Sequence, residues 1–183
     1  MAIRGTVVRY AALVPQPCGR RQGRTRLLIL VDADACPVKD EIYRVARRTG
    51  VPVRIVANSY FRVPAEPLFE QVVVGDGFDA ADDWIAERAG PGVIVVTGDI
   101  LLADRAVKAG ATVLGHNGRP FTAANIGGAV AARSLAEIGR AMTWAGDDGR
   151  GAARTGPAPF AAADRSRFLS ALDEAIGRIK RGR

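Results

Sequence analysis

A short and uninterrupted apolar run, residues 27–31 (LLILV), most constrains the fold of this chain. A run of this length without a polar residue is typical of a strand that is buried on both faces of a parallel sheet. Pro37 follows at a position where a helix can begin, and apolar residues then recur at helical spacing until Gly50. A strand followed directly by a helix predicts the first unit of an α/β fold.

The same alternation continues along the chain. We expect further strands at residues 53–57, 71–74, 93–96 and 112–114, and helices at residues 79–89, at about 100–109 and beyond Thr122. Strands that alternate with helices form right-handed crossovers and therefore lie parallel. The predicted fold class is an α/β three-layer sandwich with a mostly parallel central sheet.

The chain of 183 residues, 48% of them hydrophobic, is long enough for one buried core. We expect this domain at residues 26–143, where an alanine-rich stretch at 129–136 belongs either to the core or to an assembly face, and the core is the preferred assignment. A flexible linker rich in glycine and proline is predicted at residues 144–159, and a C-terminal helix that packs on the domain at residues 160–183.

Residues 1–25 are predicted to form a basic, disordered extension. Residues 1–26 contain six arginines and no acidic residue, so the formal net charge of +7 falls to 7 − 6 = +1 without them. Residues 27–159 carry 14 basic and 16 acidic residues. Most of the net positive charge therefore belongs to this extension, which either binds phosphates or remains unstructured. The net charge says little about the domain.

Several classes of protein are unsupported by the sequence. The two cysteines and one histidine allow neither a disulfide framework nor a paired-cysteine zinc site, which favours a reducing cytoplasm. No apolar run approaches the roughly 20 residues that cross a bilayer, so no membrane segment is expected. The glycine-rich motifs of dinucleotide and P-loop sites do not occur.

Acidic residues follow three of the predicted strands. The first strand leads into Asp32 and Asp34, the third leads to a helix start that carries Asp79 and Asp82, and Asp99 follows the fourth. The carboxyl ends of parallel strands share one edge, where open sheets bind their ligands. Carboxylates that converge there repel one another unless a cation neutralises them, and oxygen ligands suit magnesium or manganese. These five aspartates are the predicted metal ligands.

Helix capping is the alternative role for three of these acids. Asp79 and Asp99 precede predicted helices, and Asp82 stands at a position typical of a capping box. Asp32 and Asp34 end a strand and have no helix to cap, so they are the strongest candidates for metal binding or catalysis.

A resemblance to a known family adds to this interpretation. The sequence resembles the YaiI/YqxD family of bacterial proteins over nearly the whole chain from Leu27 onward, and residues 1–25 lie outside the match. The motifs that carry the resemblance are VDADACPVKDEIY at 31–43, VANS at 56–59, GFDAADDWI at 77–85, VTGDI at 96–100, NGRPFT at 117–122, NI at 125–126 and DRSRFL at 164–169.

Members of this family are similar to PIN-domain nucleases. In that comparison Asp32 resembles the first acidic motif, and Asp82 with the Thr97-x-Asp99 pattern resembles the third and fourth. The second PIN acid, a glutamate, has no clear counterpart, and Glu70 and Asp40 are the candidates for it.

The leading hypothesis is a magnesium- or manganese-dependent phosphodiester hydrolase that acts on RNA or single-stranded nucleic acid. Asp32, Asp82 and Asp99 are its predicted catalytic residues. The residues predicted to orient these acids or to bind substrate are Asn58, Thr97, Arg62 and Arg119.

Two alternatives stay open. Asp32-x-Asp34 after an apolar strand also resembles the haloacid-dehalogenase-like phosphatases, but these need a lysine or arginine beside the nucleophile, for which Arg88 is the candidate. The other alternative is a module that binds metal or nucleic acid without turnover. The sequence leaves open whether the chain is an enzyme, and its oligomeric state.

Overall fold

The structure is a computed structural model that describes residues 9–10, 27–33, 36–75, 77, 79–143 and 161–182. The strands are β1 (Arg9–Tyr10), β2 (Leu28–Asp32), β3 (Val53–Ala57), β4 (Phe69–Val73), β5 (Val93–Val96), β6 (Thr112–Leu114) and β7 (Pro120–Phe121). The helices are α1 (Lys39–Thr49), α2 (Ala80–Ala86), α3 (Ile100–Lys108), α4 (Ile126–Thr143) and α5 (Ala162–Arg181).

The seven strands form one sheet in the order β1-β4-β3-β2-β5-β6-β7. Every neighbouring pair is parallel except β6 and β7, which are antiparallel. From the central strand β2 the chain first builds β3 and β4 on one side and later β5 and β6 on the other. This confirms the predicted α/β fold with its mostly parallel sheet.

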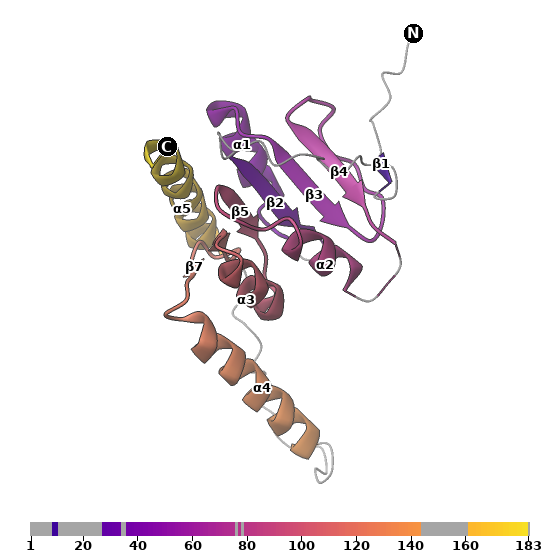
Figure 1. Cartoon of the computed structure of the whole chain (residues 1–183), viewed down its shortest axis with the longest axis vertical. Helices are drawn as coiled ribbons and strands as arrows, with labels where there is room; N and C mark the ends of the chain where they lie inside the picture. The colour runs from indigo at the N-terminus through magenta and orange to yellow at the C-terminus, as the bar shows by residue number, and fades with distance from the viewer. Residues whose placement is uncertain are drawn as a thin grey trace.

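Helices cover both faces of the sheet, which completes the three layers (Figure 1). On one face, buried residues of α1 and α5 pack with Ile29 and Val31 of β2. On the other face, α2 and α3 pack with Leu30 of the same strand. Successive side chains of a strand point to opposite faces, so a strand with helices on both sides is apolar at every position. This explains the uninterrupted apolar run from which the fold was predicted.

Helix α5 covers the sheet beside α1. Phe168 and Leu172 are fully buried in the core on this face, and Arg48 of α1 forms an ion pair with Asp173 of α5. The start of α5 also contacts the loop between β6 and β7. In that loop Gly118 has a φ of +76°, and a Cβ there would lie 2.7 Å from the backbone of Arg167. Only glycine fits both this backbone conformation and this approach.

Helix α4 projects from the body of the molecule (Figure 1). It packs on α3, and its first residue, Ile126, is buried there. Farther along, Leu135 is 69% exposed and Ile138 is 52% exposed. The expectation that residues 129–136 belong to the core is therefore wrong. Both faces of the sheet are already covered by other helices, so only one side of α4 finds a buried contact.

Of the predicted N-terminal extension, residues 1–25, the structure describes only Arg9 and Tyr10. Arg9 and Tyr10 form β1, which pairs with Val72 and Val73 of β4 and so adds an edge strand to the sheet. The rest of the predicted extension and the predicted linker at 144–159 lie outside the described residues. Within the described ranges, no helix is both long and apolar enough to cross a membrane.

Candidate active site

The candidate site lies at the carboxyl ends of β2 and β5. These two neighbouring strands mark the point where the strand order reverses, because β2 leads to β3 on one side and β5 leads to β6 on the other. Open α/β sheets bind their ligands outside the carboxyl ends of the strands at such a point. Asp32 is the last residue of β2, and Thr97 directly follows β5.

Thr97 connects two of the predicted acidic residues. Its hydroxyl donates a hydrogen bond to Oδ2 of Asp32 at 2.9 Å and accepts one from the backbone N–H of Asp99, also at 2.9 Å. The side chain of Thr97 is fully buried. The two hydrogen bonds fix the orientation of the Asp32 carboxylate and of the turn into α3.

Asp99 caps helix α3 and also pairs with an arginine of α4. One oxygen, Oδ1, accepts hydrogen bonds from the N–H groups of Leu101 and Leu102 at 2.6 and 3.1 Å. The other, Oδ2, accepts one from Nη1 of Arg133 at 2.8 Å. Partial burial raises the pKa of Asp99, but the bond from Arg133 and those from the backbone outweigh it, so its pKa lies below the ordinary value.

Asp82 lies in the first turn of α2, and other aspartates influence its pKa. Burial, followed by the negative charges of Asp32, Asp99 and Asp79, raises the pKa of Asp82 to about 6, while Arg105 opposes the shift. Helix α2 also packs against strand β2, which ends at Asp32, and against helix α3, which Asp99 caps. The structure therefore brings these four aspartates, here called the acidic cluster, to one edge of the sheet.

Asp79 does not cap α2 in the expected way. It has a φ of 66°, in the left-handed region, and its side chain makes no capping hydrogen bond. Capping needs an extended backbone at this position. The side chain is exposed beside the cluster instead. Asp34, the remaining predicted ligand, lies outside the described residues.

The residue types of the cluster fit a hard divalent cation, but the positions of their side chains do not form a complete binding site. Its members are all carboxylates, the ligands that magnesium and manganese prefer, and a cation would relieve the repulsion that raises the pKa of Asp82. Among the described residues, however, no three acidic, histidine or cysteine side chains are placed so that they could hold one ion. Both oxygens of Asp99 are already engaged.

Two further polar groups at this edge have unused hydrogen-bonding atoms. Asn58, just beyond β3, has a buried Oδ1, and His116, just beyond β6, has a buried Nε2, and neither atom has a hydrogen-bond partner among the described residues. Burial lowers the pKa of His116, against the influence of Asp32. The His116 ring lies against Gly98, where a Cβ would be 3.0 Å from Cε1 of the ring. His116 was not among the predicted site residues, although its position after a strand was the available signal.

The two predicted arginines lie on loops at the same edge. Arg62 is exposed in the segment after β3, and Arg119 is exposed just before β7. The candidates for the missing second acid do not join the cluster. Glu70 stands near the beginning of β4, at the opposite end of the sheet, and pairs there with Arg54 at 2.9 Å. Asp40 is exposed on the first turn of α1.

Glu41 is the buried acid that sequence reasoning passed over. It is only 5% exposed, on the first turn of α1, and its carboxylate lies 3.7 Å from Nε of Arg165 on α5. Burial is the main reason that the pKa of Cys36 reaches about 11, and the negative charges of Asp32 and Glu41 add to this shift. Glu41 therefore connects the rear of the candidate site to α5.

Arg88 does not provide the cation that the phosphatase alternative requires beside Asp32. The Arg88 guanidinium lies 4.1 Å from the centre of the Trp84 ring and donates to the Trp84 carbonyl and to Glu87. Arg88 follows the last turn of α2, which runs away from the carboxyl edge of the sheet toward the start of β5. Its guanidinium is therefore occupied away from Asp32.

Comparison with known proteins identifies relatives of the whole domain. The family model described as "Uncharacterized BCR, YaiI/YqxD family" matches residues 30–178. A UPF0178 protein of Sphingopyxis alaskensis is 62% identical over 155 residues, which cover 85% of this chain and 96% of the relative. A UPF0178 protein of Caulobacter vibrioides is 54% identical over 153 residues, covering 84% and 95% of the two chains.

No solved structure matches. The region matched by the family model contains the whole acidic cluster, from Asp32 to Asp99, together with the buried threonine and the arginine that hold it in place. The region that matches the family model therefore includes the candidate site, and the chain is a member of the YaiI/YqxD family.

Proposed function

We propose that this protein is a phosphodiester hydrolase that depends on magnesium or manganese and acts on RNA or single-stranded nucleic acid. The observation that carries the proposal is the convergence of Asp32, Asp82 and Asp99 at the point where the strand order reverses, close enough to raise the pKa of Asp82 to about 6. Groups with strongly shifted pKa values and specific charged neighbours are candidates for functional sites.

The order of the acids along the fold supports a nuclease. Asp32 ends β2, Asp82 lies in the first turn of α2 and Asp99 follows β5, which is the order of the first, third and fourth acidic motifs in the PIN-like resemblance described above. The proposal therefore includes a PIN-like relationship. Of the two candidates for the second acid, Glu70 pairs with Arg54 at the opposite end of the sheet and Asp40 is exposed on the first turn of α1.

Each residue of the site has a role in this proposal. Asp32 and Asp82 would hold the cation, with Asp34, Asp79 and Asp99 as further direct or water-mediated ligands. When bound, such a cation supplies a water molecule of lowered pKa and stabilises negative charge on the phosphate. Thr97 holds Asp32 in a fixed orientation through its hydroxyl. Asn58, Arg62 and Arg119 would contact the substrate backbone.

Cleavage of labelled single-stranded RNA and DNA pools in the presence of Mg²⁺ or Mn²⁺ tests this function. We expect the wild type to cleave at least one pool, and Asp32→Asn to lose on the order of 100-fold or more of the activity because a ligand carboxylate is removed. Thr97→Val should lose about 10- to 100-fold, the usual effect of removing a group that orients a ligand.

Asp104→Asn is the matched control. Asp104 lies on α3 close to Asp99, but its carboxylate pairs with Lys108 at 2.7 Å and takes no part in the interactions of the acidic cluster described above. This variant should cleave like the wild type. Equal loss in Asp32→Asn and Asp104→Asn, or cleavage that needs no divalent cation, would contradict the proposal.

A module that binds metal or nucleic acid without turnover is the second candidate. It is favoured because Glu70, a candidate for the second PIN acid, pairs with Arg54 at the opposite end of the sheet, and because both Asp99 oxygens are engaged. The same set of variants separates the two candidates. Stabilisation by Mn²⁺ that depends on Asp32, without cleavage of either pool, would support the module.

A further inference from the structure

The segment that follows β3 places an aromatic ring and a positive charge at the carboxyl edge of the sheet. Tyr60 is 56% exposed, and it is the one aromatic residue among the exposed large hydrophobic side chains of the described residues. Arg62 is exposed as well. A single exposed hydrophobic residue is ordinary, but this one lies with a guanidinium at the edge where open sheets bind their ligands. The adjoining strand, β2, ends at Asp32.

The backbone of this segment is anchored to the core. Gln71, a fully buried residue of β4, donates a hydrogen bond from Nε2 to the carbonyl oxygen of Ser59 at 3.2 Å. Phe61 packs against the core between the sheet and α1, and Val63 is only 4% exposed in that core. Exposed and buried side chains thus alternate over residues 60–63, as they do in an extended segment. The two exposed side chains therefore point to the same, solvent-facing side.

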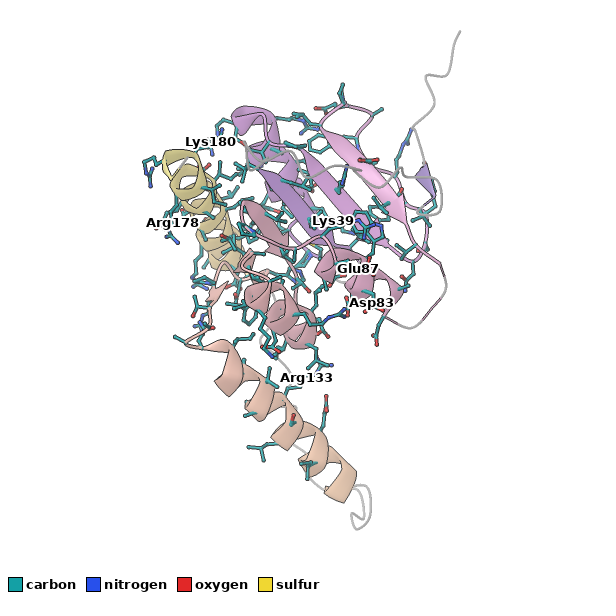
Figure 2. All side chains as sticks on the ribbon, in the orientation of Figure 1. Lys39, Asp83, Glu87, Arg133, Arg178 and Lys180 are labelled. Carbon is teal, nitrogen blue, oxygen red and sulfur yellow. The ribbon has the colours of Figure 1, made fainter. Side chains whose placement is uncertain are left out.

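Two positive charges accompany the tyrosine ring. Nζ of Lys39, on the first turn of α1, lies 4.5 Å from the centre of the Phe61 ring (Figure 2). Within the described part of the chain Arg62 forms no ion pair, whereas Arg47 of α1 and Arg54 of β3 are paired with glutamates. A guanidinium without a carboxylate partner is available to a phosphate, which it binds through its planar set of donors.

We propose that Tyr60 and Arg62 form a binding platform for single-stranded nucleic acid, in which an unpaired base stacks on the Tyr60 ring and the adjoining phosphate contacts the Arg62 guanidinium. This inference rests on the function proposed above and deepens it, because it names the residues that select single strands over duplexes. The platform needs no metal ion, since both contacts are made by side chains of the protein.

The spacing of the two side chains suits one nucleotide. Residues that are two apart in an extended segment are separated by about 7 Å, so the ring and the guanidinium can contact the base and the phosphate of the same unit. Every base has a flat π face, which makes stacking on an aromatic side chain tolerant of sequence. The bases of a duplex are stacked on one another, so their faces are not accessible to the Tyr60 ring.

Binding measured in EDTA tests the platform, because neither cleavage nor a bound metal ion then affects the result. Fluorescence anisotropy compares labelled ligands of equal length: single-stranded RNA, the same sequence as a duplex, and a strand whose sugars carry no bases. We expect Tyr60→Leu to bind single-stranded RNA about tenfold more weakly than the wild type, because one stacking contact is lost. Its affinity for the duplex and for the strand without bases should stay within about twofold. Tyr60→Phe keeps the ring and should bind like the wild type.

Arg62→Gln separates the contribution of the charge from that of the ring. It should weaken the binding of all of these ligands, since each carries phosphates, and should reduce the slope of the salt dependence by about one. Arg178→Gln is the matched control for charge. Arg178 is 69% exposed, pairs with Glu174 on α5 and lies away from Lys39 in Figure 2. Its replacement should leave every affinity within about twofold of the wild type.

Equal affinity of Tyr60→Leu and the wild type for single-stranded RNA would overturn the platform. An equal loss of affinity for the strand without bases would overturn it too, and so would absence of binding by the wild type. Absence of cleavage in Mg²⁺ or Mn²⁺, with the base-dependent loss still observed, would count against the hydrolase alone. Cleavage by the wild type, with unchanged binding by Tyr60→Leu, would count against the platform alone. Circular dichroism checks that each variant is folded.

Discussion

Asp82 combines partial burial with the repulsion of three neighbouring carboxylates, and this combination affects folding as well as function. Its pKa rises from 3.8 in the unfolded chain to about 6 in the folded protein. Between these values the folded state binds more protons than the unfolded state, so this residue makes the protein less stable as pH rises through the window.

Asp82→Asn should therefore be more stable than the wild type above pH 6 when EDTA removes metal ions. We expect a gain of about 1 kcal/mol, reduced from the full shift because solvent screens a partly exposed group. The gain should shrink toward zero near pH 4, where the wild-type carboxyl is protonated. Urea denaturation at pH 4 and pH 8 measures it. Asp83→Asn is the control, because Asp83 is 61% exposed and pairs with Arg105. A variant less stable than the wild type at pH 8 would disprove the expected repulsion.

The individual residues of the site were predictable to different degrees. Asp32, Asp82 and Asp99 follow from a simple rule, since acids that come after parallel strands meet at one edge. The left-handed backbone of Asp79 depends on the path of the loop before α2, which residue type alone does not specify. Arg133 pairs with Asp99 across 34 positions of sequence, and only the packing of α4 on α3 brings them together.

At the scale of elements, two leucines on different helices occupy opposite environments. Leu172 on α5 is fully buried against the sheet, whereas Leu135 on α4 is 69% exposed. Leu172→Ala should lower the free energy of unfolding by about 2–5 kcal/mol, because it removes buried apolar contacts and leaves a cavity. Leu135→Ala should change it by no more than about 0.5 kcal/mol.

Urea denaturation of the two variants side by side gives the comparison, and the identical substitution makes each the control of the other. A large loss of stability in Leu135→Ala would mean that this face of α4 is covered in solution. A small loss in Leu172→Ala would show that α5 contributes little to the core.

The elements themselves were largely predictable because their signals are local. Short apolar runs predicted the central strands, and the third of them, expected at residues 71–74, runs from Phe69 to Val73. The predicted helix at 79–89 ends as α2 at Ala86. The exposure of α4 was not predictable, because its apolar composition is that of a core helix. Which helices cover a sheet is decided by the whole fold.

At the scale of the whole molecule, the core begins where the family resemblance begins. The buried residues of both faces of the sheet lie between Leu27 and Ile176. Removal of residues 1–25 takes away strand β1 and five arginines, and every core residue in the described part of the chain stays in place. The shortened protein should therefore unfold cooperatively, within about 1 kcal/mol of the full chain.

Thermal or urea unfolding of the shortened protein checks this prediction. Its binding to a labelled oligonucleotide at low and high salt then shows whether the basic residues contribute, since lost phosphate contacts reduce the salt dependence. Loss of cooperative unfolding would show that the sheet needs its edge strand β1.

The packing of α5 on the sheet also matters while the protein is being synthesised. Every strand and every acid of the cluster precedes α5 in the chain, yet Phe168, Leu172 and Ile176 complete the core on the face that α1 covers only in part. Until α5 has left the ribosome, the emerging sheet displays this apolar face to its surroundings. The nascent protein is therefore most exposed to chaperones, and to association with other unfinished chains, in the interval just before its last helix emerges.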